Sequence, residues 1–156
     1  MVTNTERKGT TIFVDADACP VKQEIISVAI KYSLPYLFIA SYAHKSNKHD
    51  ERWIYVDPDK ESADLYIMNH VKKNDIVITQ DIGLASLVLP KRVFALSPRG
   101  KEYKEEAIQT ALDFRYLAAK ARRRGKYEKG PKPFTEHDRQ SFINKFEEIL
   151  SNIVVK

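Results

Sequence analysis

The sequence has one cysteine, few glycines and prolines, and no long apolar run. A single cysteine excludes an internal disulfide and a zinc site built from several thiolates. Five glycines and seven prolines in 156 residues exclude a collagen-like or low-complexity chain. No apolar run approaches the ~20 residues that span a bilayer, and the polar N-terminus lacks the apolar centre of a signal peptide. We therefore expect a globular, cytoplasmic protein that has no contact with a membrane.

Positive charge is concentrated in one part of the chain. The net charge is +5, and residues 115–132 carry eight basic residues against one acidic residue, Glu128. A local excess of this kind suits a polyanion such as nucleic acid. A solvated basic surface without a ligand would have the same composition, so charge alone leaves both interpretations open.

Apolar segments that alternate between two periodicities predict an α/β fold. Unbroken apolar runs such as residues 11–14 are typical of strands buried on both faces of a parallel sheet. Apolar residues at helical spacing follow most of these runs. The predicted strands cover residues 11–14, 36–40, 53–56, 75–79 and 93–96. We predict one domain over residues 1–156, with an open, mainly parallel sheet of about five strands and helices on both faces.

The last third of the chain is expected to add helices to this sheet. A helix is predicted from Glu102 to about Ala121, which would complete a core of about residues 11–121. A basic linker rich in glycine and proline, residues 122–134, follows it. The C-terminal helix is predicted over residues 135–151, where Thr135 and Asp138 have the spacing of a capping box.

Four carboxylates are predicted to gather at the carboxyl edge of the sheet. Asp15 and Asp17 follow the first strand, two residues apart, and Asp81 follows the fourth strand. Asp64 lies on the first turn of the helix expected over residues 62–72. In open α/β sheets this edge is where ligands bind. If the first and fourth strands are neighbours, these side chains converge on one site.

A divalent cation would account for such a cluster. Like charges repel, and burial disfavours ionised carboxylates, so a cluster without a counter-charge is unfavourable. Oxygen ligands favour Mg²⁺ or Mn²⁺, and such an ion can activate water and stabilise charge on a phosphodiester. The alternative for each acid is a helix cap. Three further acids, Asp57, Asp59 and Asp75, are interpreted as turn residues.

Two groups of basic residues are candidates for contact with nucleic acid. Arg99, in Arg99-Gly100 after the fifth strand, would lie on the same sheet edge and suits a phosphate. The linker interleaves cations with Tyr127 and Phe134, a composition that suits single-stranded nucleic acid. The linker cations are Arg122, Arg123, Arg124, Lys126, Lys129 and Lys132. An exposed turn and a solvated linker are the alternatives.

Several motifs together resemble those of the YaiI/YqxD family of uncharacterised bacterial proteins. The resemblance extends from about Ile12 to the last helix. One difference is Gly83, where the family usually has proline, and we expect it to affect only the turn. The motifs are VDADACP (14–20), ESADLYI (61–67), NDIVITQDIGLA (74–85), SPRGKEY (97–103), KGPKPFT (129–135) and DRQSF (138–142).

This family has been grouped with PIN-like domains, and the resemblance implies their properties as expectations. PIN-like nucleases hold Mg²⁺ or Mn²⁺ in a cluster of acids at the carboxyl edge of a parallel sheet and cut RNA. The resemblance matches the first-strand acid to Asp15, with Asp17 extending the site, and the helix acid to Asp64. It matches the acid of the Thr-x-Asp motif to Asp81, with Thr79 beside it.

Three functions remain open from the sequence. The first is a metal-dependent nuclease acting on RNA or single-stranded DNA, with Asp15, Asp17, Asp64 and Asp81 at its site. The second is a nucleic-acid-binding protein without catalysis, which needs the basic residues and not the acids. The third, ranked lower, is a phosphatase with Asp15 as nucleophile and Asp17 as acid/base, because Lys91 is a poor match for the phosphate-binding lysine such enzymes require.

Overall fold

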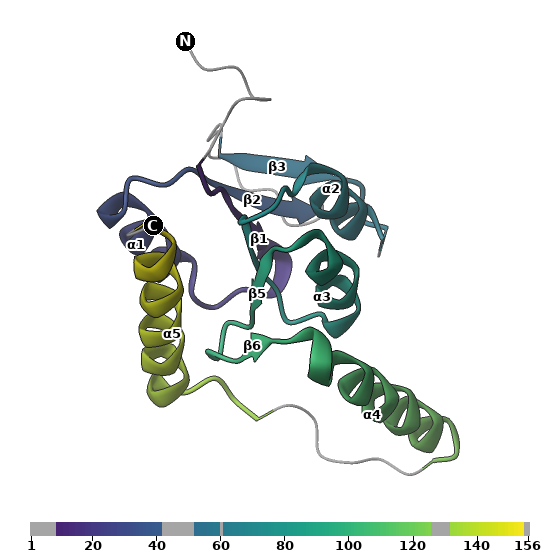
Figure 1. Cartoon of the computed structure of the whole chain (residues 1–156). Coiled ribbons are helices and arrows are strands. Elements are labelled where there is room, and N and C mark those ends of the chain that lie inside the picture. Colours follow the sequence, from purple (N-terminus) through teal and green to yellow (C-terminus); the bar gives the residue numbers. More distant parts are fainter. Residues whose placement is uncertain (1–8, 42–51, 60, 126–131, 155–156) are drawn as a thin grey trace.

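A six-stranded sheet forms the centre of the computed structural model, which describes residues 9–41, 52–59, 61–125 and 132–154. The strand order is β3-β2-β1-β4-β5-β6 (Figure 1). Neighbouring strands are parallel except at the β5–β6 pair, which is antiparallel. The strands are β1 (Ile12–Asp15), β2 (Tyr36–Ser41), β3 (Trp53–Val56), β4 (Ile76–Ile78), β5 (Phe94–Leu96) and β6 (Glu102–Tyr103). The predicted α/β class with a mainly parallel sheet is confirmed.

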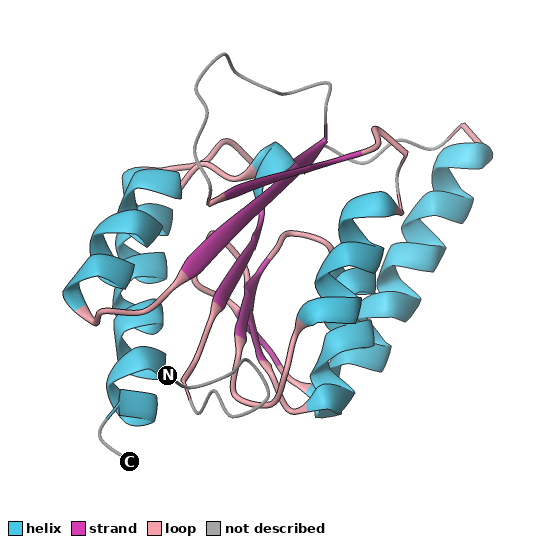
Figure 2. Cartoon of the chain, turned by 90° about the horizontal axis from the view of Figure 1, so that it is seen from above, coloured by secondary structure: helices cyan, strands magenta, loops and turns pink. Residues whose placement is uncertain are grey.

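Helices cover both faces of this sheet (Figure 2). They do so because the central strands are apolar on both faces, and each face must be buried. In β1, Ile12 and Val14 pack in the core on the side of α1 and α5, whereas Phe13 packs on the side of α2 and α3. Alternate residues of a strand face opposite sides, so a strand between two helical layers must be apolar at every position. The helices are α1 (Lys22–Lys31), α2 (Ser62–His70), α3 (Ile82–Val88), α4 (Glu105–Arg123) and α5 (Glu136–Val154), with 3-10 turns η2 (Ala16–Ala18) and η4 (Leu89–Lys91).

The strand order reverses direction beside β1. The chain moves outward from β1 to β2 and β3, then returns to place β4 on the other side of β1. Such a reversal opens a crevice at the carboxyl ends of the two central strands, where open α/β sheets bind ligands. The acids that follow β1 and β4 therefore meet at this point, as the sequence predicts.

Both ends of α4 differ from the prediction. Residues 102–103 form the sixth strand, β6, where we expect the start of a helix, and α4 begins instead at Glu105. The two-residue strand carries no apolar run that would identify it. At its other end α4 continues through Arg123 and stops at Gly125, whose backbone has φ +81°. The predicted linker therefore begins later than residue 122, because helix-forming residues extend α4 to this glycine.

The C-terminal helix is fixed at its start as predicted. The Thr135 N–H donates to Asp138 Oδ2 over 3.0 Å, and the Asp138 N–H donates to Thr135 Oγ1 over 3.1 Å. This reciprocal pair is the capping box. α5 then buries Phe142, Phe146 and Leu150 against the sheet. Within the described residues, no helix is both long and apolar enough to cross a membrane.

Candidate active site

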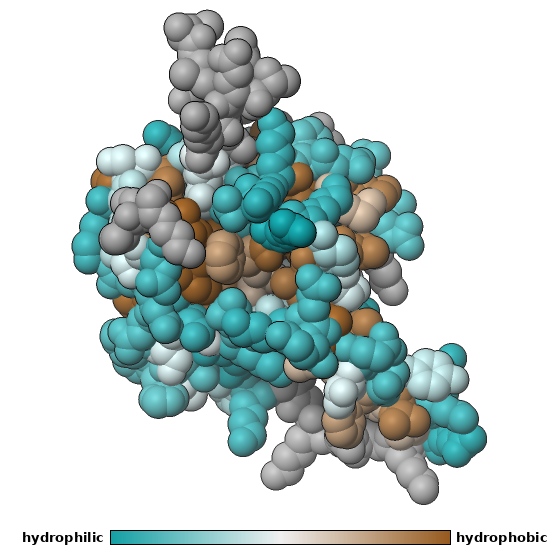
Figure 3. Space-filling model, viewed as in Figure 1, coloured by the Kyte–Doolittle hydropathy of each residue, from teal (hydrophilic) through white to brown (hydrophobic). Residues whose placement is uncertain are grey.

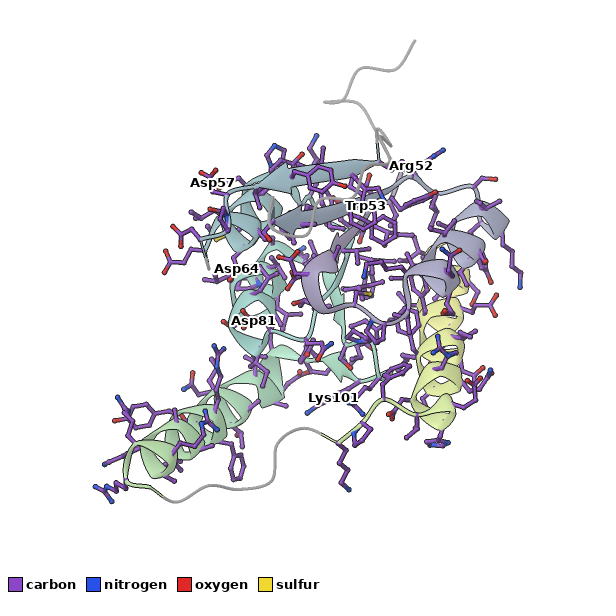
Figure 4. All side chains as sticks on the ribbon, turned by 180° about the vertical axis from the view of Figure 1, so that it is seen from behind. Arg52, Trp53, Asp57, Asp64, Asp81 and Lys101 are labelled. Carbon is purple, nitrogen blue, oxygen red and sulfur yellow. The ribbon has the colours of Figure 1, made fainter. Side chains whose placement is uncertain are left out.

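Six aspartates line one cavity at the carboxyl edge of the sheet. The cavity has a volume of about 250 Å³ and lies over the ends of β1 and β3 and the starts of α2 and α3. We call it the acidic cavity. Figure 4 shows Asp57, Asp64 and Asp81 on the same side of the molecule. Its lining residues are Asp15, Asp17, Ser41, Val56, Asp57, Pro58, Asp59, Ala63, Asp64 and Asp81.

Thr79 joins the acids that follow β1 and β4. Its fully buried hydroxyl donates to Asp15 Oδ2 over 2.9 Å and accepts from the Asp81 N–H over 2.9 Å. The Thr79 carbonyl accepts from the buried hydroxyl of Tyr103 over 3.1 Å. Thr79 therefore acts as a positioning residue that fixes Asp15 relative to Asp81.

The carboxyl group of Asp15 lies in an environment that disfavours its charge. Burial raises its pKa above the usual value, and the nearby charges of Asp17 and Asp81 raise it further. The hydrogen bond from Thr79 acts in the opposite direction. A cation beside this group would relieve the repulsion.

Asp64 shows the same effect more strongly. Burial, together with the charges of Asp81 and Asp15, raises its pKa from 3.8 to about 6. Arg115 lowers that pKa in part. Asp64 lies on the first turn of α2, and Glu61 holds the N-cap position of that helix. The cap alternative is therefore wrong for Asp64.

Asp81 is a helix cap and also lines the acidic cavity. It is the N-cap of α3, where its Oδ1 accepts from the Gly83 N–H over 2.8 Å. The same oxygen lies 3.0 Å from Nη1 of Arg115, which reaches it from α4. For Asp15 and Asp17 the cap interpretation is wrong, because no side-chain cap bond forms at η2 and the N-cap of α1 is Val21.

Asp17 is tied to the end of β2. Its Oδ1 and Oδ2 accept from the Ser41 N–H over 3.0 and 3.2 Å. Asp17 lies in η2, a 3-10 turn that the sequence does not signal, and its side chain is exposed at the rim of the cavity. Asp15 and Asp17 thus reach the same cavity from a strand end and from the turn that follows it.

Gly83 has a larger role than the turn geometry that we expect from the sequence. Its N–H completes the cap at Asp81, which proline could not do. A Cβ at this position would lie 3.0 Å from Nη1 of Arg115 and 3.1 Å from Oδ1 of Asp81. The small residue therefore leaves room for the Arg115–Asp81 ion pair.

Sequence reasoning misses two cavity acids and one cation. Asp57 and Asp59 line the cavity although their turn suggested only a structural role. They directly follow β3, so the rule that identifies Asp15 and Asp81 applies to them as well. Arg115 gives no local signal, because only the packing of α4 against α3 brings it to Asp81. Asp75 is correctly a turn residue: it is buried and accepts from the N–H groups of Thr11 and Lys72.

The donor set suits a hard divalent cation, with one restriction. Within the described residues, no group of three or more His, Cys, Asp or Glu side chains is arranged to hold a metal ion directly. Mg²⁺ commonly takes only one or two protein carboxylates and completes its shell with waters and substrate phosphates. The cavity fits that mode of binding, with carboxylate oxygens and an excess of negative charge. It does not form a complete protein cage.

The predicted nucleic-acid-binding residues lie in three places. Arg99 is held within the fold: its Nη1 lies 2.7 Å from Oδ2 of Asp138, and its guanidinium also bonds to the carbonyl of Lys132. Arg122 and Arg123 end α4, Arg124 is its C-cap, and all are exposed. Lys132 is exposed before α5, and Lys126 and Lys129 lie outside the described residues. Arg99 therefore anchors the start of α5.

The comparisons with known proteins agree with the motifs. The profile of the family described as "Uncharacterized BCR, YaiI/YqxD family" matches residues 13–152. A UPF0178 protein of Bacillus cytotoxicus is 54% identical over 141 residues, which cover 90% of this chain and 93% of that protein. A UPF0178 protein of Bacillus velezensis is 52% identical over 147 residues, covering 93% and 88%. One from Listeria monocytogenes is 51% identical over 142 residues, covering 90% and 97%. No solved structure matches the chain.

Proposed function

The chain belongs to the YaiI/YqxD family, and we propose that it is a metal-dependent nuclease that hydrolyses phosphodiester bonds in RNA or single-stranded DNA. The observation that carries this proposal is the convergence of Asp15, Asp64 and Asp81 on one cavity at the switch point of the sheet. The raised pKa of Asp64 supports it, because burial and the charges of Asp81 and Asp15 disfavour the ionised carboxylate and a bound cation would favour it.

Asp15 and Asp81 are the residues best placed to hold the cation. Thr79 fixes their relative position, and the ion would be Mg²⁺ or Mn²⁺. When bound, such an ion supplies charge stabilisation at the phosphate and a more acidic water. Asp17 lies at the rim, where it can extend the ligand set toward an incoming phosphate.

Asp64 is suited to orienting the attacking water. Among the described residues its carboxylate accepts no hydrogen bond, and it lines the same cavity as Asp15. A carboxylate without a fixed partner can accept a proton from water at the reacting phosphorus. The exposed cations of α4, from Arg115 beside the cavity to Arg122 and Arg123 at the projecting end of the helix, provide a positive surface for the strand itself.

Cleavage assays on matched variants test this proposal. Labelled single-stranded RNA and DNA are incubated with the wild type, Asp15→Asn and Asp81→Asn, in Mn²⁺, in Mg²⁺ and in EDTA. We expect hydrolysis by the wild type with either ion, none in EDTA, and at least a hundredfold loss in both variants. Glu148→Gln removes an exposed carboxylate on α5, away from the cavity, and should cleave at the wild-type rate. Full activity of Asp15→Asn with an unchanged fold would overturn the proposal.

A second candidate is nucleic-acid binding without catalysis. The exposed cations at the end of α4 favour it, since they can bind phosphates without a metal. Under this hypothesis, the affinity for RNA falls as the salt concentration rises, and neither Mn²⁺ nor Asp15→Asn changes it. The phosphatase hypothesis gains no support from Lys91, whose Nζ bonds to the carbonyl of Met68.

A further inference from the structure

α4 projects from the body of the molecule and leaves apolar surface exposed. None of its residues is buried within the described structure, and Phe114, Tyr116 and Leu117 are 70%, 60% and 57% exposed. Figure 1 shows the helix extending away from the sheet, and Figure 3 shows apolar surface on this projecting part. An exposed apolar patch of this kind is typical of a surface that binds a ligand or another macromolecule.

A groove of about 580 Å³ lies between α4 and the body. It is lined on α4 by Phe114, Arg115 and Leu117, together with small alanines, and across from them by Ile82 and Lys101. Its lining within the described residues includes no carboxylate, so its two charged side chains are both cations. The groove therefore combines a positive charge with apolar and aromatic surface.

The groove ends at the acidic cavity. Arg115 lines the groove and also contacts Asp81, which lines the cavity, over 3.0 Å. Ile82, the next residue after Asp81, lines the groove from the other side. Figure 4 shows Asp81 and Lys101 near the end of α4 that adjoins the sheet. An extended ligand bound in the groove would thus contact Arg115 and reach the carboxylates of the acidic cavity.

We propose that this groove binds a single-stranded polynucleotide, with a base stacked on Phe114 and phosphates on Lys101, Arg115 and Arg122. The proposal deepens the proposed function and rests on it for the chemistry at the cavity. Arg122 is seven residues after Arg115, which places both on the same side of α4. Stacking on an aromatic ring needs an unpaired base, so single strands are preferred over duplex.

Charge distinguishes this occupant from a second copy of the chain. In a two-fold contact through this groove, the lining of one copy, with Lys101, Arg115 and no carboxylate among the described residues, would face the same lining of the other. Such a contact would be opposed by like-charge repulsion, whereas a polyanion is attracted. Self-association through Phe114 is therefore the competing outcome in the test below.

Helical geometry supplies matched controls on the same helix. Tyr116 is exposed like Phe114 but lies two residues away, and is therefore on nearly the opposite side of α4. Arg123 is on the side of Tyr116, seven residues further along, and is exposed like Arg122. Phe114 and Arg122 thus each have a neighbour of like chemistry on another side of the helix.

The test is binding of a fluorescein-labelled oligouridylate about a dozen nucleotides long, measured by anisotropy in EDTA so that no cleavage occurs. We expect Phe114→Ala to weaken binding about tenfold, within the range of one stacked base. Lys101→Gln and Arg122→Gln should each lower the slope of affinity against salt by ~0.7. Tyr116→Ala and Arg123→Gln should bind within about twofold of the wild type.

Two substitutions separate stacking from general apolar contact. Phe114→Trp keeps an aromatic face and should bind as the wild type does, whereas Phe114→Leu should bind as weakly as Phe114→Ala. The proposal is overturned if Phe114→Leu keeps full affinity, or if Tyr116→Ala and Arg123→Gln weaken binding as much as their groove partners. It is also overturned if the oligonucleotide does not bind and light scattering finds a dimer that Phe114→Ala dissociates.

Failure of this inference and failure of the proposed function give different results. Groove-dependent binding in EDTA with no cleavage in Mn²⁺ would retain the groove and exclude the nuclease. Cleavage that requires Asp15 but is unaffected by Phe114→Ala and Arg122→Gln would retain the nuclease and exclude the groove. Thermal unfolding of each variant verifies that the exposed positions on α4 do not affect folding.

Discussion

Asp64 is the residue whose pKa reports the electrostatics of the cavity most directly. Burial and the charges of Asp81 and Asp15 raise its pKa to about 6, so between about pH 4 and pH 6 the folded chain binds a proton that the unfolded chain has released. The free energy of unfolding therefore falls as pH rises through this window, because the folded state binds more protons.

Asp64→Asn should be more stable than the wild type at neutral pH. We expect a gain of about 1 kcal/mol at pH 7, after allowing for the partial exposure of the side chain, and no difference near pH 4. Urea denaturation at several pH values measures the difference, with Glu148→Gln as a control for loss of a carboxylate. A wild type as stable as Asp64→Asn at every pH would show that Asp64 is not electrostatically strained.

Thr79 gives a second prediction at the residue scale. Thr79→Val keeps the shape of the side chain but leaves Asp15 Oδ2 without a donor and the Asp81 N–H without an acceptor. We expect the free energy of unfolding to fall by about 2 kcal/mol. Thr79→Ser retains the hydroxyl and should lose less than about 1 kcal/mol. Equal stability of the two variants in urea denaturation would mean that the hydroxyl bridge does not hold the two acids.

At the scale of elements, the turn before β6 is packed against α5. Gly100 has φ +89°, and a Cβ there would lie 2.6 Å from the carbonyl carbon of Ser141. Neither the backbone conformation nor the contact can be relieved by moving a flexible side chain. Together with the Arg99–Asp138 ion pair, this turn fixes where α5 crosses the sheet edge.

Gly100→Ala should therefore destabilise the chain far more than Gly125→Ala. Gly125 also has a positive φ, +81°, but no atom of the described residues lies within 4 Å of an added Cβ. We expect a loss of about 1 kcal/mol at Gly125, from backbone strain alone, and of about 3 kcal/mol at Gly100. Thermal and urea denaturation compare the two. Equal losses would indicate that α5 moves away to accommodate the methyl group.

Elements with a strong apolar pattern were predictable, and those set by tertiary packing were not. The runs at residues 11–14, 36–40 and 53–56 identify strands because burial on both faces requires apolar residues throughout. β6 escapes prediction because its two residues are set by pairing with β5 and by the Gly100 turn. The reach of Arg115 from α4 to Asp81 likewise depends on how two helices pack.

The residues of the candidate site that directly follow a strand of the parallel sheet were predictable from the sequence. Asp15 and Asp81 come directly after central strands, and the position of strand ends in a parallel sheet brings them together. Asp57 and Asp59 follow β3 in the same way but were interpreted only as turn residues. Thr79 was noted only beside Asp81, because its bridging role depends on a hydrogen bond between two different strands.

At the scale of the whole molecule, opposite charges are separated into two adjoining features. The acidic cavity gathers carboxylates at the switch point of the sheet, and the α4 groove presents cations immediately beside it. A metal-dependent phosphodiesterase needs both, because the metal requires the acids and the polyanion requires the cations. The Arg115–Asp81 ion pair is the point at which the two features meet.

Calorimetric titration of Mn²⁺ tests the central claim most directly, using the wild type, the double variant Asp15→Asn/Asp81→Asn and the control Glu148→Gln. The acidic cavity should give saturable binding in the wild type and in Glu148→Gln, and none in the double variant, with all three proteins folded by thermal unfolding. Binding of equal strength in the double variant would contradict a metal site at Asp15 and Asp81.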